Sequence, residues 1–160
     1  MVDNNTPFTL SEVKAAQAKL KNYLVQTPVL RLYSSVVNKL LGDQAEVVLK
    51  LELFQRTGTF KARGAINSAL NCTPEQIRNG FTAVSAGNHA VATAFAAQMM
   101  GTTAKVVMIE SANPMRVAKC RQYGGEIVFA DDVHTAFEIV KKLQSDGYTF
   151  LHPFDGRNVS

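Results

Sequence analysis

The chain has 160 residues, of which 46% are hydrophobic and 19% are charged. It is therefore long enough to bury the core of one ordinary domain, and its composition excludes a disordered chain. Its 17 Lys and Arg residues against 13 Asp and Glu give a formal net charge of +4. Because these charges are spread along the chain without a dense run, we expect no nucleic acid partner.

Cysteine content and hydropathy indicate the cellular compartment of the protein. Cys72 and Cys120 have neither a metal-ligand spacing nor the pattern of a disulfide framework, which indicates a reducing compartment. The first residues lack the basic and apolar segments of a signal peptide. No apolar run approaches the roughly 18 residues of a membrane span. We therefore expect a cytoplasmic protein that does not insert into a membrane.

The N-terminal third predicts two helices and two strands. Thr9 and Glu12 have the spacing of a capping box, which predicts a helix with an apolar face formed by Leu10, Val13, Leu20 and Leu24. A break at 26–28 ends it. The runs 29–32 and 46–51 are typical of strands, and 34–41 is typical of a short helix that ends at Gly42.

From residue 60 onward, helical and extended patterns alternate with short connections. Expected helices cover 60–70, a short stretch from 73, 88–100, a stretch from 114 that ends before 124, and 133–144. Expected strands cover 81–84, 104–109, 126–129 and 148–151. This alternation predicts the α/β class, with a parallel sheet flanked by helices.

Lys61 is the first candidate for chemistry. A lysine in the first turn of a helix is usually a solvated surface residue. Here Phe60 and several small residues crowd the turn, and the segment 57–59 before it brings backbone amides close to any bound group. Apolar neighbours near a helix N-terminus disfavour the charged amine, which suits Schiff-base chemistry. The residues alone leave both interpretations open.

The turn 85–89, Ser-Ala-Gly-Asn-His, is the second candidate. Small residues between a strand and a helix allow an anion to approach unpaired backbone amides at the positive end of the helix, and a carboxylate or phosphate suits that position. The alternative is structural: Asn88 caps the helix and Ser85 bonds the turn. His89 alone is more often a packed residue than a catalyst.

Other polar residues have simpler explanations. No cluster of His, Asp and Glu has metal-ligand spacing, so we expect no metal site. His134 and His152 are isolated and are given no role. The glycine pair 124–125 follows a helix and precedes a strand, which is the wrong order for a dinucleotide fingerprint and favours a helix stop. The pair 131–132, two aspartates, is interpreted as a helix cap.

The segments 51–65 and 85–90 together resemble the threonine/serine dehydratases, which are fold-type-II pyridoxal-phosphate enzymes. Thr59 stands where that family commonly has serine, and residues 152–155 match a stretch that the family carries further along. The resemblance covers essentially the whole chain. It implies an incomplete three-layer αβα fold, similar to that of the tryptophan synthase β subunit.

The resemblance also assigns roles to residues. Lys61 would form the Schiff base with pyridoxal 5'-phosphate, Phe60 would pack beside the cofactor, and Asn88 would bond its 3′ oxygen. The small amino-acid substrate would be bound through its α-carboxylate by Ser85, Gly87, Asn88 and His89. The implied reaction is β-elimination of water from L-threonine or L-serine, which gives a 2-oxo acid and ammonia.

The resemblance further predicts a division into domains. Family members continue through a glycine-rich loop that holds the cofactor phosphate, and no run of three or four glycines occurs in this sequence. We expect residues 1–50 to belong to a larger domain, 51–152 to form a smaller α/β domain, and 153–160 to begin a truncated crossover. The chain is thus interpreted as a fragment with little or no lyase activity alone.

Two other functions stay open at this point. One is a catalytically inactive α/β fragment that serves as a binding or assembly module. The other is an amino-acid racemase or a β-replacement enzyme of the same fold, although the turn 85–89 is not one of the asparagine-rich variants that favour β-replacement. Ala86 stands where such racemases have a serine, and because alanine has no transferable proton, we expect dehydration rather than racemisation. Threonine or serine preference, a homo-oligomeric state and regulation are left undecided.

Overall fold

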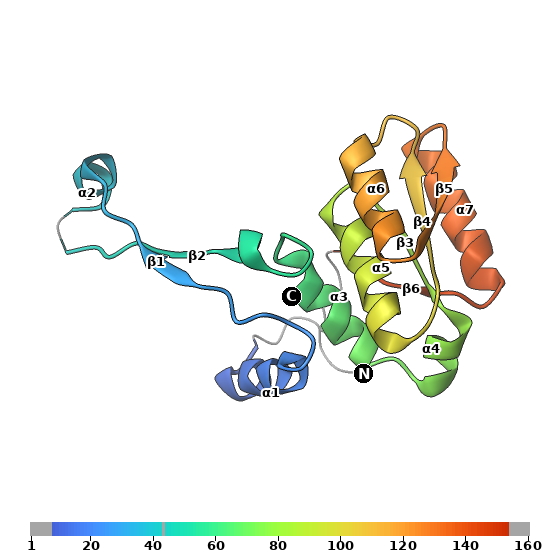
Figure 1. The fold of residues 1–160 in the computed structure, drawn as a ribbon, viewed down its shortest axis with the longest axis horizontal. Coiled ribbons are helices and arrows are strands. Elements are labelled where there is room, and N and C mark those ends of the chain that lie inside the picture. Colours follow the sequence, from blue (N-terminus) through green and yellow to red (C-terminus); the bar gives the residue numbers. More distant parts are fainter. Residues whose placement is uncertain (1–7, 43, 154–160) are drawn as a thin grey trace.

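The structure, a computed structural model, describes residues 8–42 and 44–153. The elements of its N-terminal part are α1 (Leu10–Leu20), β1 (Val29–Arg31), α2 (Ser35–Leu41) and β2 (Val48–Lys50). In this part, β1 and β2 pair antiparallel, with Leu30 opposite Leu49, and extend together with α2 away from the rest of the molecule, whereas α1 packs against helix α3, which spans Lys61–Leu70 (Figure 1).

A parallel sheet of four strands in the order β5-β4-β3-β6 forms the centre of the remaining chain. Its strands are β3 (Phe81–Val84), β4 (Ala104–Ile109), β5 (Gly125–Ala130) and β6 (Thr149–Phe150). Two helices, α3 (Lys61–Leu70) and α4 (Pro74–Asn79), precede β3, and the helices between the strands are α5 (Asn88–Met100), α6 (Pro114–Gln122) and α7 (Val133–Ser145). The bounds of β3, α5 and β4 agree with those predicted from the sequence.

The helices cover both faces of this sheet. Helix α5 packs on β3, β4 and β5, and α3 and α6 pack on α5, while α7 packs on all four strands from the other face (Figure 1). The prediction of an α/β protein with a parallel sheet between helical layers is therefore confirmed.

Helix α5 is the centre of the core because it lies between the sheet and two other helices. Every residue from 89 to 97 is buried, and most are alanines, which permit close packing on all sides. Gly125 on β5 allows the closest approach: a Cβ there would lie 2.7 Å from Cys120 Sγ and 2.9 Å from Ala94 Cβ. Gly124 ends the α6 turn with a φ of +78°, so the two glycines have different purposes.

Helix α1 differs partly from its prediction. The capping box is present, with Thr9 N–H donating to Glu12 Oε2 (2.8 Å) and Glu12 N–H donating to Thr9 Oγ1 (3.3 Å). The predicted apolar face is not buried, since Leu10 and Val13 are 69% and 55% exposed and only Leu20 of the helix is buried. A helical periodicity predicts an apolar stripe, but burial requires a surface to cover it.

Three further observations complete the fold. A 3₁₀ turn at Glu52–Phe54 was not predicted. Among the described residues, no helix combines the length and apolar character needed to cross a bilayer. The predicted boundaries at 50 and 152 stay a prediction, and of the predicted crossover 153–160 and the matched stretch 152–155, residues 154–160 lie outside the described part of the chain.

Candidate active site

The loop before Lys61 is held to the N-terminal segment by one buried side chain. The amide of Gln55 accepts from Val25 N–H (3.0 Å) and donates to the Val25 carbonyl (2.9 Å), as a neighbouring strand would. The same Gln55 Oε1 accepts from Arg56 N–H. Thr57, also buried, donates to the Thr59 carbonyl at 3.2 Å. These bonds fix the path of the chain into α3.

A second set of bonds holds the first turn of α3. Arg63 donates to both oxygens of Glu52, from Nε at 2.9 Å and from Nη2 at 2.7 Å. Thr27 Oγ1 donates to the same carboxylate at 2.6 Å. The hydrogen bond from Arg63 is the main reason that the pKa of Glu52 lies below its usual value. A bidentate pair of this kind restricts both side chains, so the first turn of α3 is anchored two residues from Lys61.

Lys61 is the first residue of α3. Its Nζ donates a hydrogen bond to the carbonyl oxygen of Pro153 at 2.7 Å and lies 5.4 Å from the centre of the Phe60 ring. The Lys61 side chain is half-buried, and the neighbouring Phe60 side chain is exposed. The amine is thus held near the end of β6 rather than pointing into open solvent.

The turn 85–89 lies at the carboxyl end of β3, where α5 begins. Ser85 Oγ accepts from Gly87 N–H at 3.1 Å, so the structural interpretation of Ser85 is confirmed. The interpretation of Asn88 as the helix cap is wrong, since the N-cap is Gly87, without a side-chain cap bond. The N–H groups of the first helical turn have no carbonyl partner within the helix, and they give this end of α5 a positive potential.

The Asn88 side chain is oriented by a residue that the sequence did not point to. Arg116 on α6 donates from Nη1 to Asn88 Oδ1. Because the amide oxygen is occupied, the Asn88 NH₂ group is the part left to donate to a ligand. No spacing or motif connects Asn88 with Arg116, which lies 28 residues away.

His89 directs its imidazole into the protein. It is 4% exposed, and Nε2 donates to the carbonyl oxygen of Leu151 at 2.8 Å, with Thr93 Oγ1 at 3.5 Å. The carbonyl can only accept, so Nε2 carries the proton. Burial is the main cause of a lowered pKa, to which the charge of Lys61 also contributes. His89 is therefore a packed histidine whose Nε2 is already bonded within the protein.

The segment 151–153 brings the two sequence motifs together. The Leu151 carbonyl binds His89 and the Pro153 carbonyl binds Lys61, two residues apart on the same extended stretch. The sequence showed a family match at His152 and Pro153 but no role for their backbone. Such backbone acceptors carry no side-chain signal, which is why sequence reasoning missed them.

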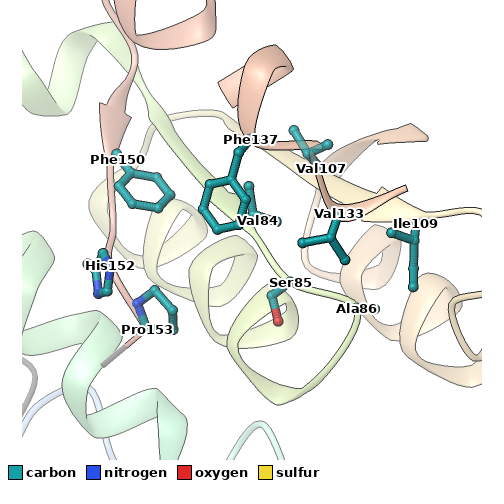
Figure 2. Close-up of a pocket in the computed structure, with 10 residues that line it drawn as sticks. All are labelled: Val84, Ser85, Ala86, Val107, Ile109, Val133, Phe137, Phe150, His152 and Pro153. Atoms are coloured by element: carbon teal, nitrogen blue, oxygen red, sulfur yellow. The ribbon is translucent and has the colours of Figure 1, made fainter. Parts of the chain in front are cut away.

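A pocket of about 280 Å³ opens beside the turn. Figure 2 shows Ser85, Ala86 and Pro153 along one side of it, with Phe137 and Phe150 opposite. Its walls come from the ends of β3, β4 and β6 and from the start of α7. The pocket therefore adjoins both the turn 85–89 and the Pro153 carbonyl that holds Lys61.

Comparison with known proteins identifies the family of this chain. A model described as "Pyridoxal-phosphate dependent enzyme" matches residues 20–160. Phenylserine dehydratase from Ralstonia pickettii is 46% identical over 97% of this chain and 47% of its own length. L-threonine ammonia-lyase from Thermotoga maritima is 37% identical over 95% of this chain and 37% of its own.

Solved structures agree. Maize serine racemase superposes with a TM-score of 0.84 at 32% identity, covering 94% of this chain and 45% of that one. The chain spans about half the length, or less, of these relatives. The family match covers most of the chain and includes both motifs. The chain therefore belongs to the pyridoxal-phosphate dependent enzymes of fold type II.

Proposed function

We propose that this chain carries the lysine-bearing part of a lyase that removes water from a β-hydroxy amino acid, such as L-threonine or L-serine, and releases a 2-oxo acid and ammonia. The observation that carries the proposal is the pair of backbone carbonyls at Leu151 and Pro153. The first binds His89 and the second binds Lys61, so one short segment connects the two sequence motifs. An amine and an anion-binding helix N-terminus in one place suit an amino-acid substrate.

The residues fit pyridoxal phosphate. A Cβ on Gly87 would meet nothing closer than Ser85 Oγ at 3.9 Å, and its φ of −128° does not require glycine. The open space beside this turn is thus explained by a ligand that approaches the backbone. Thr59 Oγ1, two residues before Lys61, is buried without a hydrogen-bond partner among the described residues. An unpartnered buried hydroxyl is costly and suits a bound polar group.

Each residue has a distinct task in this proposal. Lys61 would hold the cofactor through its amine and then move the proton at the substrate Cα. Asn88, oriented by Arg116, would donate its NH₂ to the cofactor's 3′ oxygen, beside an exposed Phe60 ring. Pyridoxal phosphate, when bound, supplies the electron sink that stabilises negative charge at Cα.

The substrate carboxylate would lie against the start of α5. The backbone N–H of His89 and the Ser85 hydroxyl, with Gly87 and Asn88, would bind it, because these groups surround the positive end of the helix. The imidazole of His89 takes no part, since it is buried and bonded to Leu151. Among the described residues, Lys61 is therefore the one to which we assign proton transfer.

A racemase of the same fold is the second candidate. Serine racemases are among the relatives, including one from Schizosaccharomyces pombe at 36% identity over 99% of this chain. A racemase needs an acid on the face of Cα opposite Lys61, and Ala86 offers none. Ala86 therefore favours elimination over racemisation.

Borohydride labelling tests the proposal. The complete polypeptide of the reading frame, loaded with pyridoxal phosphate, is reduced and digested, and the modified peptide is identified by mass spectrometry. We expect the label on Lys61 and its absence in Lys61→Ala. A matched variant, Lys105→Ala, should keep the label. Label on Lys50 or Lys105 instead, or no label at all, would contradict the proposal and favour a non-catalytic module.

A further inference from the structure

The pocket beside the turn has the chemistry of a side-chain subsite. It is lined by apolar side chains from four elements: Val84, Val107, Ile109, Val133, Phe137 and Phe150. Its polar side chains, Ser85 and His152, lie toward the edge formed with Pro153 (Figure 2). Among the described residues, no carboxylate, lysine or arginine lines it. Such a cavity suits an apolar group and offers no partner to a charged one.

The size of the pocket decides what fills it. Its volume is about 280 Å³, whereas an apolar cavity of about 150 Å³ is already sufficient to hold benzene. The methyl group of threonine or the hydrogen of serine would leave most of the space empty. A phenyl ring or a branched alkyl group of similar size would bury its surface against Phe137 and Phe150.

The position of the pocket connects it with the substrate. Ser85 and Ala86 belong both to its wall and to the anion-binding turn, and Pro153 joins its wall to the amine of Lys61. A substrate with its carboxylate on the turn and its Cα near Lys61 would direct its Cβ toward the wall that Ser85, Ala86 and Pro153 form. A substituent on Cβ then enters the pocket without moving the other two groups.

We infer that the preferred substrates are β-hydroxy amino acids with a bulky apolar β-substituent of about the size of a phenyl ring. The inference rests on the proposed function, because it takes the carboxylate and Cα positions from it. For 3-phenylserine, Cα loses a proton and Cβ loses hydroxide as water. The resulting enamine becomes an imine and takes up water to give phenylpyruvate and ammonia, so no oxidant or reductant is needed.

The first test compares substrates in the complete polypeptide loaded with pyridoxal phosphate. We expect kcat/KM for L-threo-3-phenylserine to exceed that for L-threonine at least 10-fold, since a single methylene in an apolar pocket already changes this ratio by about 10- to 200-fold. A preference for L-threonine or L-serine, with good turnover of either, would overturn the inference and leave the proposed function standing.

The second test narrows the pocket. Val133, the first residue of α7, is 57% exposed and lines the pocket, so Val133→Trp adds volume at the rim with little strain. We expect the kcat/KM ratio of phenylserine to threonine to fall at least 10-fold. Lys142→Trp, nine residues on and on the opposite side of α7, is the matched control and should leave the ratio unchanged. An unchanged ratio in Val133→Trp contradicts the inference.

A binding measurement separates failure of the pocket from failure of the reaction. L-phenylalanine and L-alanine cannot lose a β-hydroxyl, so calorimetry reports their affinity without turnover. We expect L-phenylalanine to bind at least 10-fold more tightly than L-alanine, and Val133→Trp to remove the difference. That result with no elimination from any β-hydroxy amino acid would support the pocket and overturn the proposed function. Equal affinities would overturn the inference.

Discussion

The ε-amine of Lys61 donates a hydrogen bond to the carbonyl oxygen of Pro153, 2.7 Å away and 92 residues further along the chain. This contact connects the start of α3 with the end of β6. It keeps the amine beside the turn at the start of α5, where the proposed substrate carboxylate would bind. Lys61 Nζ therefore has both a structural contact and a proposed chemical role, and mutation can separate the two.

Lys61→Arg should keep the structural contact and lose the chemistry. A guanidinium still donates to the Pro153 carbonyl, so we expect the free energy of unfolding to change by less than about 0.5 kcal/mol. Lys61→Ala removes the donor and should cost about 0.5–1.5 kcal/mol. Urea denaturation measures both, and borohydride labelling should be lost in both. An arginine variant that retains the label would contradict the role of Lys61.

Gly87→Ala should weaken ligand binding without destabilising the fold. A Cβ at Gly87 meets only Ser85 Oγ, at 3.9 Å, so the stability change should stay within about 0.5 kcal/mol. The added methyl would occupy space beside the backbone amides, and we expect substrate KM to rise at least 10-fold. The control is Gly125→Ala, whose Cβ would lie 2.7 Å from Cys120 Sγ and should cost about 1–3 kcal/mol. An unaltered KM in Gly87→Ala would show that no ligand approaches there.

His89 should make the protein less stable in mild acid. Burial lowers the pKa of His89 in the folded protein below the ordinary 6.5. At a pH between the folded-state pKa and 6.5, the unfolded chain therefore binds more protons than the folded one. The contribution of neutral His89 to the free energy of unfolding is fully present above about pH 6.5, and it falls as the pH drops toward the folded-state pKa. Unfolding at pH 7.5 and 5.5 measures the difference. It should shrink in His89→Gln and persist in the exposed His134→Gln. The same pH dependence in His89→Gln would assign it to another group.

Ala86→Ser should introduce racemisation. Ala86 lines the pocket next to Ser85, and a serine there would supply a proton to the face of Cα opposite Lys61. General acid assistance contributes about 10²–10⁴-fold, which is enough to divert part of the intermediate. We expect chiral analysis of L-serine incubated with the variant to reveal D-serine, with little from the unmutated enzyme. If the unmutated enzyme forms D-serine as fast as pyruvate, Ala86 does not decide the outcome.

Local features of the fold could be predicted from the sequence because short-range chemistry determines them. Gly101, in the left-handed conformation, ends α5, and the capping box at Thr9 marks the start of α1. The burial of the α1 apolar face could not be predicted, because periodicity says nothing about the surface that would cover it, and Leu10 and Val13 are exposed.

The two motifs of the candidate site could be recognised in the sequence, whereas the groups that support them could not. Lys61 and the turn at Ser85 stand in recognisable motifs, and the structure brings them together through Leu151 and Pro153. Those supports are backbone carbonyls far along the chain. Arg116 approaches Asn88 from another helix, and the pocket forms only where four separate elements meet. Such long-range arrangements depend on tertiary packing, which no local pattern contains.

The late position of Leu151 and Pro153 has a consequence for biosynthesis. A ribosome adds about 5–20 residues per second, so about 5 to 18 seconds separate the synthesis of Lys61 from that of Pro153, 92 residues later. Until the ribosome reaches Leu151 and Pro153, the nascent chain has the lysine, and after residue 89 also the turn, but not the carbonyls that hold them. The bond that holds the Lys61 amine can therefore form only after β6 and the residues that follow it have been synthesised.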